Sequence, residues 1–178
     1  MKNETSNKKY EILSDESIIS YCSFMPVKVF RIKALKSFGN VKKGDLGGFV
    51  EGCHNLSQDG NCWIYDGSIC CNNANVSDNA KLKGFSTMID DSVLSDNAVV
   101  DKHSILTNSS IVRNNANVKN YSLITFNAIV EGDCVINKCS ISSNGVVGGL
   151  VELHNVSVCD MKILNQKDVQ GIKLKRNM

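Results

Sequence analysis

Residues 59–142 divide without a gap into fourteen hexads that read DGNCWI, YDGSIC, CNNANV, SDNAKL, KGFSTM, IDDSVL, SDNAVV, DKHSIL, TNSSIV, RNNANV, KNYSLI, TFNAIV, EGDCVI and NKCSIS. The fourth position is always Ala, Ser or Cys, and the sixth is aliphatic, Met or Cys except at Ser142. Because alternate side chains of a strand share one side, the fourth and sixth positions are predicted to point inward and the fifth outward. The second and third positions are mostly Asp, Asn and Gly, which tolerate left-handed backbone at corners.

A unit of six residues cannot bury a core by itself, so the hexads must stack. The repeat, and SDNAKL and SDNAVV in particular, resembles the left-handed parallel β-helix of hexapeptide-repeat proteins, in which three hexads form one triangular coil. The resemblance implies an all-β solenoid of about five to six coils, and the left hand follows from the resemblance alone.

The segments that flank the repeat are less regular. The lead-in RIKALKSFGNVKKGDLGGFVE, which continues into NLSQDGNCWIYD, resembles hexapeptide-repeat proteins of phages and prophages, most of which have no assigned function. A solenoid needs its sheet edges covered. We therefore expect an N-terminal cap with lead-in strands over residues 1–50, the β-helix over 51–148, and a C-terminal cap with the basic tail KLKRNM over 149–178.

Composition narrows the classes of protein. The 178 residues carry a net charge of +2, too little for a typical DNA- or RNA-binding protein. No apolar stretch is long enough to span a membrane, and MKNETSNKKYEIL lacks a signal core, so we expect a cytoplasmic protein, in the bacterial host cell if it is phage-encoded. The eight Cys show no CxxC or zinc-type spacing, so neither a metal nor a cofactor is expected, and Cys62 and Cys134 fill inward positions.

The outward fifth positions define three faces. The first is mixed, and it reads Trp63, Lys81, Val99, Asn117 and Val135. The second and third are largely aliphatic, and they read Ile69, Thr87, Ile105, Leu123 and Ile141, and then Asn75, Val93, Ile111 and Ile129. Exposed aliphatic faces usually mark interfaces, so we expect a homotrimer built through Ile69, Ile105, Leu123, Val93, Ile111 and Ile129. The alternative is that a cap or the tail folds back over one face.

A column of rings indicates a ligand site. On the second face the third hexad positions are Gly67, Phe85, His103, Tyr121 and Cys139, which places three rings at one corner, about 4.8 Å apart. Lys83, Lys102, Lys119 and Lys138 lie beside them, and Arg113 is nearby in the chain. Rings next to cations suit a small anionic ligand, for example a cyclic or modified nucleotide. The same rings could instead only pack a seam between subunits.

Three functions remain open. The leading hypothesis is a non-catalytic binding protein, most specifically a phage-encoded sponge that sequesters nucleotide immune signals in clefts between the subunits of a trimer. The first alternative follows from the resemblance, since hexapeptide-repeat trimers are best known as acyltransferases; His103 would be the general base and Asp101 would orient it. Against it, the hexads run without the protruding loop common in such enzymes. The motifs of other enzyme classes, namely GxSxG, the phosphate loop and GxGxxG, are also missing. The second alternative is a purely structural trimerisation module.

Overall fold

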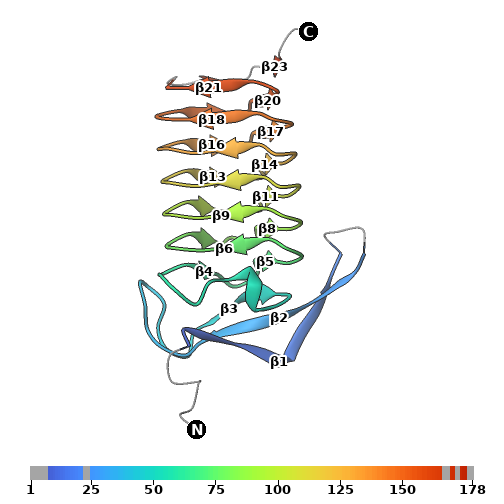
Figure 1. Ribbon diagram of the computed structural model, residues 1–178, viewed down its shortest axis with the longest axis vertical. Coiled ribbons are helices and arrows are strands. Elements are labelled where there is room, and N and C mark those ends of the chain that lie inside the picture. Colours follow the sequence, from blue (N-terminus) through green and yellow to red (C-terminus); the bar gives the residue numbers. More distant parts are fainter. Residues whose placement is uncertain (1–7, 22–24, 166–168, 171–172, 176–178) are drawn as a thin grey trace.

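The computed structural model describes residues 8–21, 25–165, 169–170 and 173–175, and it describes side chains as far as Asn165. The chain winds into a stack of triangular coils in which three parallel sheets enclose one interior (Figure 1). The described residues contain no α-helix, and the short 3₁₀ turn η2 (Cys53–Asn55) precedes the first regular coil. No helix among them is long and apolar enough to cross a membrane. The predicted all-β solenoid is confirmed.

Each sheet corresponds to one predicted face. The first face contains β4 (Trp63–Ile64), β7 (Lys81–Leu82), β10 (Val99–Val100), β13 (Asn117–Lys119), β16 (Val135–Asn137), β19 (Glu152–His154) and β22 (Val169–Gln170). The second contains β3 (Leu46–Val50), β5 (Ile69–Cys70), β8 (Thr87–Met88), β11 (Ile105–Leu106), β14 (Leu123–Ile124), β17 (Ser140–Ser142), β20 (Ser157–Cys159) and β23 (Lys173–Lys175). The third contains β6 (Asn75–Val76), β9 (Val93–Leu94), β12 (Ile111–Val112), β15 (Ile129–Val130), β18 (Val146–Gly148) and β21 (Lys162–Leu164).

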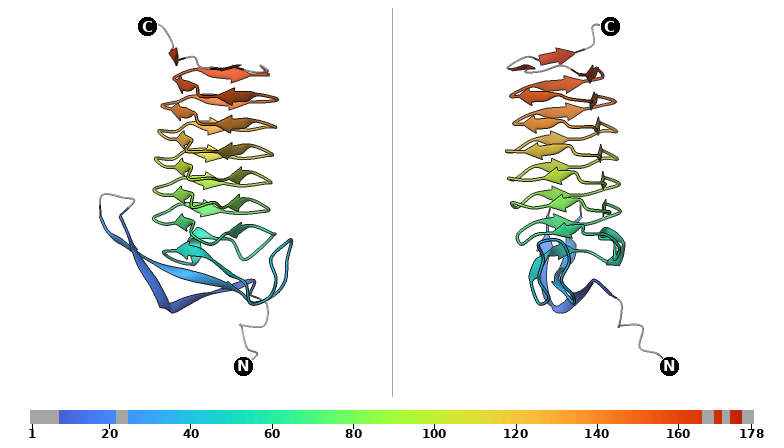
Figure 2. Two further views of the ribbon diagram at one scale, coloured as in Figure 1. Left: turned by 180° about the vertical axis from the view of Figure 1, so that it is seen from behind. Right: turned by 90° about the vertical axis from the view of Figure 1, so that its left-hand side faces the viewer.

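An antiparallel hairpin closes the N-terminal end. It consists of β1 (Tyr10–Ser20) and β2 (Val27–Ala34), and it projects sideways from the base of the stack (Figures 1 and 2). β2 pairs antiparallel with β3, so the hairpin continues the second face and covers its first sheet edge. The same region covers the outward Trp63, which is only 2% exposed because the rings of Phe38 and Tyr10 pack against it.

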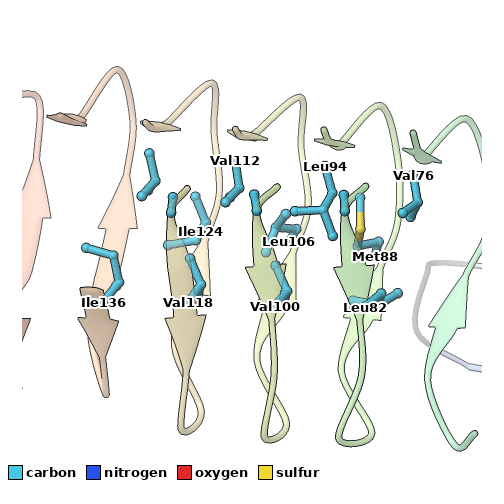
Figure 3. Close-up of a cluster of buried hydrophobic side chains, with 14 of the residues drawn as sticks. Val76, Leu82, Met88, Leu94, Val100, Leu106, Val112, Val118, Ile124 and Ile136 are labelled. Atoms are coloured by element: carbon cyan, nitrogen blue, oxygen red, sulfur yellow. The ribbon is translucent and has the colours of Figure 1, made fainter. Parts of the chain in front are cut away.

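The interior is a single apolar column. Val76, Leu82, Met88, Leu94 and Val100 occupy successive sixth hexad positions and point into the same space from the three faces (Figure 3). Every fourth and sixth position from Cys62 to Ile136 is buried, which confirms thirteen of the fourteen hexads. Corner residues such as Asn72, Asp78 and Asp96 have φ between 54° and 57°, the left-handed backbone expected there.

The fourteenth hexad is different. Its pattern predicts that Ser140 and Ser142 point inward, but the structure buries Cys139 and Ile141 instead. Leu123 pairs with Ser140, seventeen positions on, whereas Val99 pairs with Asn117, eighteen positions on. Because strand side chains alternate, one missing residue reverses which of them point inward. The predictions that Ile141 points outward and that Cys139 belongs to the outward column are therefore wrong.

The coils continue beyond residue 148, where the sequence suggests a cap. Strands β19 to β23 extend the sheets in parallel, and Val146 pairs with Lys162, sixteen positions on. The hexad pattern fades there because the coils shorten to seventeen and then sixteen residues, while the solenoid itself goes on. Residues 176–178 of the basic tail lie outside the described residues.

Candidate functional site

Three rings form a stack on the edge where the first face turns into the second. The rings of Phe85 and His103 lie 5.5 Å apart with planes 11° from parallel, and those of His103 and Tyr121 lie 5.0 Å apart with planes 9° from parallel. All three side chains are exposed, Tyr121 to 72%. We call Phe85, His103 and Tyr121 the ring column and the corner that carries them the ring edge.

The backbone of the ring edge explains why the rings align. At each of these corners two successive residues have left-handed backbone, for example Lys102 (φ 53°) and His103 (φ 60°). Successive corners are joined by hydrogen bonds along the solenoid axis: the His103 amide donates to the Gly84 carbonyl (2.8 Å), and the Tyr121 amide donates to the Lys102 carbonyl (2.9 Å). Bulky residues seldom adopt this conformation, so three of them at one edge are unusual.

The predicted lysines share the ring edge but differ in their partners. The Lys83 Nζ pairs with Asp101 Oδ2 at 3.3 Å. Among the described residues, no hydrogen bond or ion pair involves the ammonium groups of Lys102, Lys119 or Lys138. Three cations are therefore left to meet an anionic group that approaches the rings.

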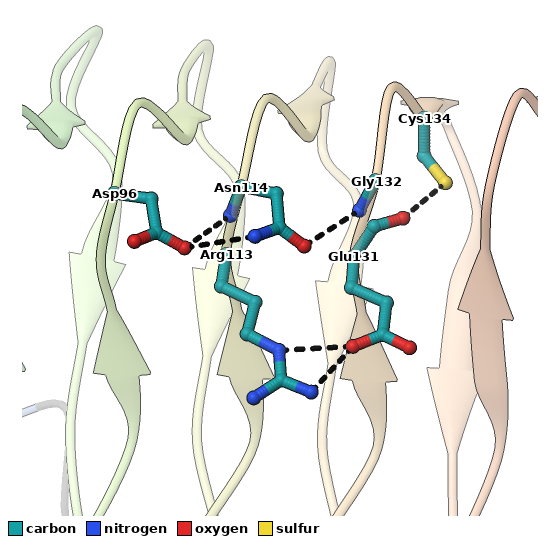
Figure 4. A network of polar contacts seen from close by, with 6 residues as sticks. All are labelled: Asp96, Arg113, Asn114, Glu131, Gly132 and Cys134. Atoms are coloured by element: carbon teal, nitrogen blue, oxygen red, sulfur yellow. Dashed lines mark hydrogen bonds and ion pairs between the residues drawn. The ribbon is translucent and has the colours of Figure 1, made fainter.

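Arg113 lies elsewhere. It begins the corner between the third and first faces, so strand β13 separates it from the ring edge. Its Nε and Nη2 donate to Glu131 Oε2 on the next coil, beside a ladder in which Asn114 donates to Asp96 and accepts from the Gly132 amide (Figure 4). The structure thus does not bring Arg113 together with the other predicted site residues.

Asp101 does not orient His103 as the sequence suggests. Asp101 Oδ1 accepts a hydrogen bond from the Lys102 amide at 2.8 Å, and Oδ2 pairs with Lys83. Both carboxylate oxygens are therefore engaged with other groups. The ring of His103 is positioned by the rings stacked on its two faces.

The three histidines differ in the availability of their nitrogens. His54 Nε2 lies 2.7 Å from the Asn72 carbonyl oxygen. His154 Nδ1 lies 2.9 Å from Asn137 Nδ2, and its Nε2 lies 3.9 Å from a carboxylate oxygen of Glu152. No hydrogen bond within the described part of the chain uses a ring nitrogen of His103. His103 is therefore the histidine whose nitrogens are available to a substrate.

The predicted interface faces are covered unequally. Ile69 is half-buried in an outer cluster with Val29, Phe49 and Ile89, because β2 and β3 extend over that end of the second face. Higher on the same face Ile105 and Leu123 are exposed, at 41% and 36%. Phe126, at the far corner of this face, is also exposed. On the third face, Val93, Ile111 and Ile129 are half-buried.

Two hollows lie away from the ring edge. One of about 550 Å³ is lined by Asn144, Val146, Asp160, Met161 and Lys162, and another of about 330 Å³ lies near Tyr10 and Cys53. The seven described cysteines are free thiols, and Cys22 lies outside the described residues. The described residues show no cluster of three potential metal-binding side chains. The side chains of the ring column are exposed, so a second surface beside them would help to enclose a ligand.

Comparison with known proteins shows a distant similarity to an acetyltransferase. No family model matches the chain. Over 85 residues the chain is 32% identical to an uncharacterized acetyltransferase, YdcK, of Escherichia coli strain K12. The similarity covers 46% of this chain and 26% of that relative, so the chain matches about a quarter of the relative's length. The chain is thus a β-solenoid with distant similarity to an acetyltransferase.

Proposed function

We propose that this protein is an acyltransferase that transfers an acyl group from a coenzyme A thioester, with His103 as the general base. The single observation that carries the proposal is the state of His103: an exposed imidazole, held between two parallel rings, whose nitrogens have no protein partner among the described residues. The similarity to a protein named as an acetyltransferase supports the same chemistry.

The proposed step conserves atoms and charge. The acceptor is a hydroxyl or a neutral amine. A nitrogen of His103 takes the proton from this group as its oxygen or nitrogen attacks the thioester carbonyl carbon. The carbon–sulfur bond then breaks, and the coenzyme A thiolate takes up the proton from the imidazolium. The products are the acylated acceptor and free coenzyme A. The stacked rings hold the imidazole in place without using either of its nitrogens.

We propose further that the active form is a trimer. Ile105 and Leu123 are exposed apolar neighbours on the paired strands β11 and β14, and Phe126 is exposed at the far corner of the same face, which is unfavourable on a free chain. A neighbouring chain packed against this face would lie beside the ring edge, since strands β11 and β14 begin two residues after His103 and Tyr121. Such a neighbour would make the ring edge one wall of a cleft.

The experiment is a thiol-release assay with matched histidine variants. Acetyl-CoA is incubated with a bacterial metabolite extract as the source of acceptors, and free coenzyme A is measured for the wild type, His103→Gln and His154→Gln. Loss of a general base typically costs about a hundredfold to ten-thousandfold in rate, so His103→Gln should lose turnover and His154→Gln should keep it. Equal rates for the wild type and His103→Gln would refute the role of His103.

A second function is supported by the engagement of Asp101. An acyltransferase base is usually oriented by a carboxylate, and here both oxygens of Asp101 are already used. A non-catalytic protein that sequesters a nucleotide needs only the rings and the cations of Lys102, Lys119 and Lys138. Such a protein would bind its ligand stoichiometrically and return it unchanged on denaturation. A purely structural trimerisation module would bind neither a coenzyme A thioester nor a nucleotide.

A further inference from the structure

The two ends of the ring column differ in how they are covered. At the N-terminal end the rings rest on Gly67, where a Cβ would lie 2.5 Å from Phe85 Cδ1. Both faces of the His103 ring are occupied by its neighbours. Tyr121 contacts His103 with one face, and no ring or ammonium group of the described residues lies over its other face. The column therefore has one open face, on Tyr121, turned toward the C-terminal coils.

That face is open because the next coil is one residue short at this edge. The corner below has two left-handed residues, Asn120 and Tyr121, and the second carries the ring. The corner above has only Lys138 in that conformation, and it is followed at once by the inward Cys139. The missing residue is the one that would have continued the column. A step about the thickness of one aromatic ring is left above Tyr121.

The step is positively charged. Lys138 forms its upper corner, with its amide bonded to the Lys119 carbonyl at 3.3 Å. Among the described residues, neither the Lys138 nor the Lys119 ammonium group has an anionic partner, and Asp101, a carboxylate of this edge, is paired with Lys83. A phosphorylated ligand whose planar ring filled the step would thus place its phosphates near the free ammonium groups of Lys138 and Lys119.

We propose that the open face of Tyr121 is a stacking site for the adenine ring of a phosphorylated adenine nucleotide, which would take the place of the missing fourth ring, with its phosphates on Lys138 and Lys119. The choice of adenine rests on the proposed function, since coenzyme A carries a phosphorylated adenosine. A free adenine nucleotide has the same chemistry. Stacking on an aromatic side chain and contact with lysines are sufficient for such a ligand.

The test compares two variants that each remove one ring of the column. Only one of them, Tyr121→Asn, removes the open face. Asn accepts left-handed backbone, so Tyr121→Asn and Phe85→Asn should both fold. A third variant, an insertion of Phe between Lys138 and Cys139, restores the eighteen-residue coil and fills the step. The probes are adenosine 3′,5′-bisphosphate, coenzyme A and ATP, and their affinity for the full chain is measured by calorimetry.

We expect Tyr121→Asn and the insertion each to weaken binding of the bisphosphate by about tenfold or more, the effect of losing one base–aromatic stack. Phe85→Asn and Tyr121→Phe should stay within about twofold of the wild type, because the open face is kept. If coenzyme A binds more tightly than ATP, the ligand of the site is an acyl donor. If ATP binds more tightly, the ligand is a free nucleotide.

The outcomes separate this site from the proposed function. Equal weakening by Phe85→Asn and Tyr121→Asn, no effect of the insertion, or no binding to the wild type would overturn the site, even if acyl transfer is observed. The expected pattern without thiol release would overturn the acyltransferase and leave the site in place.

Discussion

The ring of His103 stacks on that of Tyr121 at 5.0 Å, although both residues have left-handed backbone, with φ of 60° and 61°. For bulky residues this conformation costs about 1 to 3 kcal/mol each, and an aromatic pair returns only about 0.5 to 1.5 kcal/mol. Asn or Gly would suit these corners better, as they do at most others. The ring edge is therefore a place where stability is given up, which is typical of functional sites.

The contact between Gly67 and Phe85 can be isolated by a pair of alanine variants. Gly67 and Gly44 both have positive φ, +78° and +94°, so alanine is strained at either position. A Cβ at Gly44 would meet nothing within 4 Å, whereas at Gly67 it would clash with Phe85. We expect Gly67→Ala to lower the free energy of unfolding by about 1 to 3 kcal/mol more than Gly44→Ala, as measured in urea. Equal losses would show that Phe85 does not rest on Gly67.

Lys9 is a buried cation that closes the N-terminal end of the interior. It is 1% exposed, and its Nζ donates to the carbonyls of Asp59 (3.0 Å) and Cys62 (3.1 Å) and lies 5.1 Å from the centre of the Phe38 ring. Lys9→Met keeps the apolar stem but removes the ammonium donor from both carbonyls, so we expect a loss of about 1 to 3 kcal/mol in the free energy of unfolding measured in urea. The exposed neighbour serves as the control, and Lys8→Met should change little. A Lys9→Met variant whose free energy of unfolding equals that of the wild type would contradict this role.

The buried thiols should make the protein sensitive to alkali. Burial raises the pKa of Cys134 from 9.0 to about 11 in the folded chain. The unfolded chain then releases this proton first, so the stabilisation is complete below pH 9 and is lost as pH rises through about 11. Ala occupies the fourth position in several other hexads, so Cys134→Ala should be tolerated. It should make the fall in unfolding free energy between pH 9 and 11 shallower. Cys53→Ala, which removes an exposed thiol, is the control. An unchanged slope of the unfolding free energy against pH in Cys134→Ala would refute this account of the alkali sensitivity.

The second face should hold the subunits together. A charge at Ile105 or Leu123 would be buried against a neighbouring chain, at a cost of several kcal/mol. Ile105→Glu and Leu123→Glu should therefore shift the mass measured by light scattering from three chains toward one. Asn117→Glu, at an outward position of the first face, should leave the trimer intact. A wild-type chain that is already monomeric would rule out the assembly.

The sequence predicts the solenoid because the hexad rule concerns only inward side chains and corners. It places Phe85, His103 and Tyr121 together for the same reason, since residues eighteen apart lie above one another. It fails at Cys139, where the loss of one residue changes the register and where Ser142, at a sixth hexad position, is the sign of that change in the repeat. It also cannot show that Asp101 pairs with Lys83, or that residues of β2 and β3 partly bury Ile69, because these contacts depend on side-chain and segment placement.

Arg113 shows the limit of proximity in sequence. It is ten residues from His103, yet the width of the first face separates the two on the prism, and Glu131 provides its partner. The one-residue step above Tyr121, by contrast, could have been found in the sequence. The next inward positions, Cys139 and Ile141, are more apolar than the Ser140 and Ser142 that an unbroken repeat requires.

The most direct test of the proposed function counts acyl groups. The purified protein is incubated with isotopically labelled acetyl-CoA and a bacterial metabolite extract, then denatured, and the label is assigned by mass spectrometry. We predict labelled acceptor in large excess over protein chains, and no such excess with His103→Gln. Recovery of the label only as unchanged acetyl-CoA, at no more than about one molecule per chain, would contradict catalysis and leave a binding protein.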